Sequence, residues 1–107
     1  AGRGELIARA QAGEVVVIYV RPEAEYRAGH LPFARSLPLH ELKQRLDELP
    51  KDKPIVAYCR GPFCLMAPQA VEMLQASGFR AARLEDGVAE WRAHGLPLEI
   101  ETDRSST

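Results

Sequence analysis

The sequence lacks the long apolar runs and the excess charge that would point to a membrane or to nucleic acid. No apolar stretch approaches the roughly 20 residues that a membrane-spanning helix needs. The formal net charge of the 107 residues is −1, so the chain has no general attraction for nucleic acid or anionic lipid. We therefore expect no direct nucleic acid contact by this domain and no membrane association.

Cysteine and histidine are also scarce. The chain has two cysteines, Cys59 and Cys64, and three histidines, His30, His40 and His94. Two cysteines so close in sequence do not make a disulfide framework, and no Cys/His pair has zinc-ligand spacing. We expect no metal, no cofactor and a reducing, cytoplasmic location. In such a location the cysteines stay reduced, and one of them can be a reactive thiol.

What is present is the composition of one globular domain. Apolar residues make up 46% of the sequence and charged residues 27%, which is ordinary usage for a chain with a single core. We expect one domain over residues 1–107, with its core at about 15–98 and with frayed ends.

Strand and helix patterns alternate along the chain. Strands are expected at 15–20, 34–37, 55–58 and 80–84, and helices at 5–12, 23–28, 41–49, 64–77 and 87–94. This alternation predicts an α/β fold of three layers, a mainly parallel central sheet with helices on both faces. Functional sites in such folds lie at the carboxyl ends of the strands.

Cys59 lies at such an end, directly after the strand predicted at 55–58. The loop that follows it consists of Arg60, Gly61, Pro62, Phe63 and Cys64, and a helix comes next. The amide N–H groups of the loop, the helix N-terminus and the Arg60 guanidinium all favour a negative sulfur. Cys59 is therefore a candidate nucleophile, and the alternative is a buried structural cysteine.

Cys64 has two interpretations, and both stay open at this point. As a second thiol at the start of the helix, it can form a disulfide with Cys59 and make a redox switch. As a small apolar side chain, it simply fills the first helical turn.

Three segments in order resemble one known family. They are 20–32, the strand and loop 55–64, and 84–91 together with 95–97. Over about 15–98 the chain resembles a single rhodanese-like (sulfurtransferase) domain, in particular the rhodanese domains attached to bacterial ArsR-type transcriptional regulators. The resemblance implies the three-layer rhodanese-like fold.

The resemblance also implies an activity. A sulfurtransferase of this kind moves a sulfane sulfur from thiosulfate or a persulfide donor to a thiol or cyanide acceptor. Cys59 matches the family's nucleophile, which carries the sulfur as a persulfide. The loop residues 60–64 match the cradle that binds the substrate, in which Arg60 would help to bind an anionic donor.

The same resemblance assigns Arg21, Glu25 and His30 to a structural clamp beside the cradle. Tyr19 occupies a position where family members usually have Asp, so it either weakens the support of the loop or fills space. Phe63 and Cys64 stand where many members that use thiosulfate have small polar or basic residues, so the resemblance implies a less cationic cradle here. This change favours a persulfide on another protein or on a small thiol as the donor.

Two other functions compete with sulfur transfer. Phosphatases and arsenate reductases with a similar loop have an arginine six positions after the cysteine, and that position here is Leu65. Phosphate chemistry is therefore disfavoured. The second competitor is a non-catalytic sensor module, in which Cys59 and Cys64 report sulfur or redox status. The ArsR-type resemblance supports it and implies fusion to a DNA-binding domain in the parent protein.

Overall fold

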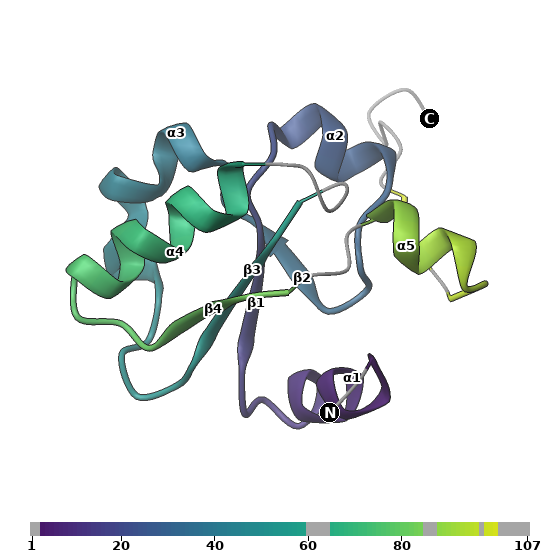
Figure 1. Cartoon of the computed structure of the whole chain (residues 1–107), viewed down its shortest axis with the longest axis horizontal. Helices are drawn as coiled ribbons and strands as arrows, with labels where there is room; N and C mark the ends of the chain where they lie inside the picture. Colours follow the sequence, from purple (N-terminus) through teal and green to yellow (C-terminus); the bar gives the residue numbers. More distant parts are fainter. Residues whose placement is uncertain (1–2, 60–64, 85–87, 97, 101–107) are drawn as a thin grey trace, which may run out of the picture.

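The computed structural model describes residues 3–59, 65–84, 88–96 and 98–100 (Figure 1). In chain order its elements are α1 (Arg3–Gln11), β1 (Val16–Tyr19), α2 (Glu23–Ala28), β2 (Ala34–Ser36), α3 (Leu39–Leu42), the 3₁₀ helix η1 (Lys43–Glu48), β3 (Ile55–Tyr58), α4 (Met66–Ala76), β4 (Ala81–Arg83) and α5 (Val88–Ala93). Within these ranges, no helix has the length and apolar character needed to cross a membrane.

The strands form one parallel sheet in the order β2-β1-β3-β4. β1 and β3 occupy the centre, and their register runs from Val16 opposite Ile55 to Tyr19 opposite Tyr58. Both are continuous apolar runs, as expected for strands that are covered on both faces. The predicted α/β fold with a parallel central sheet is confirmed.

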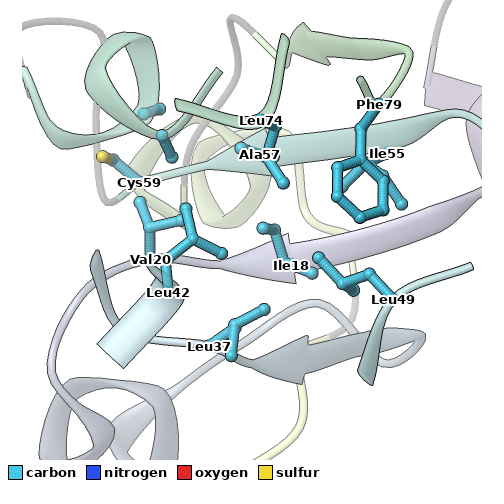
Figure 2. Packing of buried hydrophobic residues seen from close by; sticks show 12 residues of the cluster. Ile18, Val20, Leu37, Leu42, Leu49, Ile55, Ala57, Cys59, Leu74 and Phe79 are labelled. Carbon is cyan, nitrogen blue, oxygen red and sulfur yellow. The ribbon is translucent and has the colours of Figure 1, made fainter. Parts of the chain in front are cut away.

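Alternate residues of β1 enter two separate cores, because successive side chains of a strand point to opposite faces. Ile18 packs in the cluster that includes residues of α3 and α4, which Figure 2 shows from close by. Val17 and Tyr19 pack in the cluster that includes residues of α1 and α5. Figure 1 shows these two pairs of helices on opposite sides of the sheet, which is the predicted three-layer arrangement.

The prediction of one continuous helix over 41–49 is wrong. The structure has the short helix α3, followed by 3₁₀ turns in which Arg45 has non-helical angles (φ −116°, ψ 17°). Leu49 is extended (φ −105°, ψ 137°), because the residue before a proline is disfavoured in the helical region. Short terminal turns of this kind commonly adopt the tighter 3₁₀ ladder. Leu42 and Leu49 are nevertheless buried in the core.

Helix α4 begins and ends where the sequence indicates, within two residues. Pro68 is its third residue, where a missing N–H has little cost because the first turn lacks intrahelical acceptors. After the helix, Gly78 adopts a left-handed φ of 92°, the conformation that glycine allows at a helix C-terminus. The helix packs on the sheet through Ala67, Ala70 and Leu74.

Because Leu74 is fully buried, we predict that Leu74→Ala lowers the free energy of unfolding by about 2–5 kcal/mol, from lost burial and the cavity left behind. Glu72→Ala on the exposed side of the same helix is the matched control and should change it by less than about 0.5 kcal/mol. Urea denaturation measures both. Equal effects of the two substitutions would contradict this assignment of the helix faces.

Candidate functional site

The candidate site lies at the carboxyl edge of the sheet, where β1 and β3 end side by side. Cys59 follows Tyr58 directly, and its backbone is bonded on two sides. The N–H of Val20 donates to the carbonyl of Tyr58 (3.3 Å), and the N–H of Val88, at the start of α5, donates to the carbonyl of Cys59 (3.2 Å). The main chain at the candidate nucleophile is thus fixed between β1 and α5.

The Cys59 side chain belongs to the core cluster beneath α3 and α4. Figure 2 shows it at the end of a row that continues from Ile55 and Ala57 along one face of β3. It is 2% exposed, and its sulfur is disulfide-bonded in this structure. The cysteine described here is therefore in its oxidised form and largely screened from solvent.

The rest of the predicted cradle lies outside the described residues. It comprises Arg60, Gly61, Pro62, Phe63 and Cys64, so the roles assigned to these residues remain predictions. The description resumes at Leu65, which precedes α4 and whose carbonyl accepts the N–H of Gln69 (3.2 Å).

Arg21 links α2 to the beginning of α4. Its Nε and Nη2 donate to the two carboxylate oxygens of Glu25, each at 2.8 Å, and its Nη1 contacts the Sδ of Met66 at 3.3 Å. The hydrogen bonds to Glu25 hold the pKa of Arg21 above its ordinary value. The arrangement fits the clamp expected from sequence. The contact with Met66 was not predicted, because nothing in the sequence joins two residues so far apart.

On the face of the sheet opposite the Cys59 side chain, two tyrosine rings stack at the ends of β1 and β3. The rings of Tyr19 and Tyr58 lie 4.7 Å apart and 23° from parallel, and both are fully buried. The Tyr58 hydroxyl accepts the N–H of Leu31 (3.0 Å), and burial raises the pKa of Tyr58 well above its ordinary range. Tyr19 thus packs against the residue that precedes Cys59. Tyr58 was not predicted to have this role, although an aromatic side chain at the last strand position was the available signal.

His30 is buried and has close partners, which fits the structural clamp that the family resemblance implies. Its ring is 2% exposed, stacks on Tyr26 at 3.7 Å, and has Nδ1 2.7 Å from the Tyr26 carbonyl oxygen. Its backbone pairs with Glu99 (2.9 and 2.8 Å), which ties the C-terminal segment to the end of α2. Among the described residues, no group of three His, Cys, Asp or Glu side chains is arranged to hold a metal ion.

Comparisons with known proteins agree with this geometry. The model of the rhodanese-like domain matches residues 3–94. The chain is 52% identical over 97 residues to the HTH-type transcriptional regulator Rv0324 of Mycobacterium tuberculosis; the match covers 91% of this chain but 43% of that protein. It is 36% identical over 90 residues to a sulfurtransferase of Allochromatium vinosum, which covers 83% of this chain and 82% of that protein.

A solved structure shares the fold over nearly the whole chain. The crystal structure of a protein from Lactobacillus plantarum superposes with a TM-score of 0.81 at 28% identity, covering 90% of this chain and 83% of the other. The arrangement of the sheet and helices around the Cys59 edge is therefore one that solved proteins also adopt.

We predict that Tyr58→Phe lowers the free energy of unfolding by about 1–3 kcal/mol at pH 7, because the buried N–H of Leu31 loses its acceptor. Tyr26→Phe, which removes the donor to the Ala34 carbonyl (2.8 Å) from a half-buried ring, should cost less. Denaturant unfolding gives the free energy of unfolding of each variant, and the two losses show how much each hydroxyl contributes. A larger loss in Tyr26→Phe would rule out the special role of Tyr58.

The raised pKa of Tyr58 also predicts how stability depends on pH. Below about pH 10 the phenol is neutral in both states; above it the unfolded chain ionises while the folded chain holds Tyr58 neutral, so the free energy of unfolding falls. Tyr58→Phe should flatten this alkaline fall by up to about 1.4 kcal/mol per pH unit. Unfolding measured from pH 8 to 11 checks this, and an unchanged slope would contradict it.

Proposed function

The chain belongs to the rhodanese-like domain family, and on that premise we propose that it transfers a sulfane sulfur through a persulfide on Cys59. The observation that carries the proposal is the position of Cys59. Cys59 directly follows the central strand β3, at its carboxyl end, and its carbonyl accepts the N–H of Val88. The relatives of this chain include proteins named as sulfurtransferases.

The proposed reaction has two displacement steps. The Cys59 thiolate attacks the outer sulfur of thiosulfate, forming Cys59–S–S⁻ and releasing sulfite; with a persulfide donor R–S–S⁻, the leaving group is the thiolate R–S⁻. Cyanide or an acceptor thiolate then takes the outer sulfur, giving thiocyanate or a new persulfide and restoring the Cys59 thiolate. No electrons are gained or lost overall, so no cofactor is required.

The surrounding residues have supporting roles in this proposal. The amides of the loop 60–64 and the Arg60 guanidinium bind the negative sulfur and the anionic donor. Arg21 and Glu25 are positioning residues, because their ion pair extends to Met66 at the start of α4. The reaction needs Cys59 reduced, which agrees with a reducing, cytoplasmic location.

A second proposal is that the same thiol acts as a sensor within a longer regulator. It is supported by the similarity to an HTH-type transcriptional regulator, of which this chain spans less than half. In such a protein the domain would be fused to a DNA-binding domain and would report the state of Cys59. Sensing and sulfur transfer use the same persulfide, so the two roles can coexist in one protein.

A disulfide offers the chemistry for such a sensor. Cys59 is disulfide-bonded, and Cys64 is the other cysteine of the sequence. Peroxide would oxidise the Cys59 thiol to a sulfenic acid with release of water, and the Cys64 thiol would displace a second water to close the disulfide. Alternatively, the sulfur of the Cys64 thiol would attack the inner sulfur of Cys59–S–S⁻ to form the disulfide, and the outer sulfur would leave as hydrosulfide with the proton of that thiol.

We predict that the reduced protein forms several molecules of thiocyanate per chain from thiosulfate or a persulfide donor and cyanide. Cys59→Ser should lower this rate by about 10³-fold or more, because the nucleophile is lost. Glu72→Ala, an exposed substitution on α4, is the matched control and should keep the full rate. An active Cys59→Ser would eliminate both proposals.

For the disulfide, we predict that peroxide removes two free thiols per chain in a monomer and that dithiothreitol restores them. In Cys64→Ala the sulfenic acid on Cys59 has no partner within the chain, so oxidation proceeds further and becomes largely irreversible. Thiol titration and intact mass measure the two outcomes. If peroxide and dithiothreitol act on Cys64→Ala as they do on the wild type, Cys64 only fills the helical turn.

A further inference from the structure

The sulfur of Met66 accepts a hydrogen bond from a charged donor. Nη1 of Arg21, in the segment between β1 and α2, donates to the Sδ of Met66 at 3.3 Å. Met66 is the first residue of α4 and is half-buried. A thioether is a weak acceptor, so its sulfur does not require such a partner. The contact therefore gives Met66 a feature that packing alone does not explain.

Glu25 fixes the direction of this donor. Nε and Nη2 of Arg21 donate to the two carboxylate oxygens of Glu25 at 2.8 Å each, and a bidentate pair of this kind holds the planar guanidinium in one orientation. Both side chains are 28% exposed, so solvent screens the ion pair only in part. The remaining nitrogen, Nη1, is consequently held against the sulfur of Met66.

Met73, the second methionine of the sequence, has similar surroundings without such a donor. It lies about two turns further along α4, is likewise half-buried, and packs against the same core cluster as Met66. Within the part of the chain that the structure describes, no hydrogen bond is formed to its sulfur. The chain thus contains its own comparison for the effect of Arg21 on a thioether.

A donor on one lone pair of a thioether leaves the other lone pair for reaction. Oxygen added to one lone pair or to the other gives two different sulfoxide epimers. Hydrogen peroxide is not much larger than water and reaches a half-buried sulfur. Attack through the lone pair that Arg21 covers has to break a charge-assisted hydrogen bond first. Oxygen is therefore expected on the uncovered side of the Met66 sulfur.

We propose that Met66 is a reversible oxidation site, at which Arg21 directs the oxidant to one lone pair so that one sulfoxide epimer predominates. The sulfur gives an electron pair to one oxygen of hydrogen peroxide, and the S–O bond forms as the O–O bond breaks. The second oxygen takes the proton of the first and leaves as water. The sulfur is oxidised by two electrons, and the peroxide is reduced by two.

The reverse step needs a reductase that accepts this epimer. Two thiols supply the electrons and become a disulfide, and the sulfoxide oxygen leaves as water. This modification uses neither cysteine of the chain, so it is independent of the proposed sulfur transfer on Cys59.

The test is oxidation of the folded protein, with its disulfide intact, by hydrogen peroxide, followed by digestion. Peptide mass spectra assign each added oxygen to Met66 or Met73, and treatment of the peptides with the two epimer-specific methionine sulfoxide reductases gives the epimer ratio at each. Arg21→Ala removes the donor, and Arg21→Lys keeps the charge without the guanidinium fork. Arg27→Ala is the matched control, because it removes an arginine of α2 whose ion pair is with Glu23 (3.4 Å).

In the wild type, one epimer should exceed the other at Met66 by about tenfold, because one direction of attack loses a charge-assisted hydrogen bond. Arg21→Ala and Arg21→Lys should bring this ratio to within about twofold of equality. Arg27→Ala should keep the wild-type ratio, and the ratio at Met73 should be the same in all four proteins. Melting temperatures confirm that each variant is folded.

Three results would overturn the inference. Met66 is not an oxidation site if it stays unmodified at a peroxide dose that oxidises it in the urea-unfolded protein. An equal mixture of epimers at Met66 in the wild type, or an unchanged ratio in both Arg21 variants, would show that Arg21 does not direct the attack. None of these results bears on sulfur transfer by Cys59, which thiocyanate formation tests separately.

Discussion

The parallel pairing of β1 with β3 is the constraint on which the site depends. The register places Tyr19 opposite Tyr58. Because side chains alternate along a strand, these two tyrosines lie on one face of the sheet and Cys59 lies on the other. The phenols stack on the face shared with α1 and α5, and Cys59 points to the face covered by α3 and α4. The thiol therefore faces the helix that follows its own loop. A shift of one residue in register would exchange the two faces.

Features that depend on local sequence could be predicted. α2 and β3 have the predicted boundaries, since proline, glycine and continuous β-branched residues act within a few positions. Trp91 is buried in the core, as its helical spacing from Val88 indicates. The 3₁₀ turns of η1 were missed because Arg45 departs from helical angles while bonding Glu41 and Glu48, which an apolar pattern does not reveal.

The parts of the site that could not be predicted are contacts between distant segments. Arg21 reaches Met66, the Tyr58 hydroxyl meets Leu31, and His30 pairs with Glu99. Each joins residues whose proximity follows from the completed fold and not from any local spacing. Tyr19 illustrates the difference: sequence alone left open whether it supports the loop or fills space, and the structure shows its ring packed against the residue before Cys59.

The central claim is that Cys59 accepts and carries a sulfane sulfur, whether the parent protein uses it for catalysis or for sensing. Its most direct test is intact mass spectrometry of the reduced protein after incubation with a persulfide donor, followed by peptide mapping. We predict a mass increase of one sulfur atom, located on Cys59 and removed by cyanide. An unmodified wild-type chain, or the same adduct on Cys59→Ser, would contradict it.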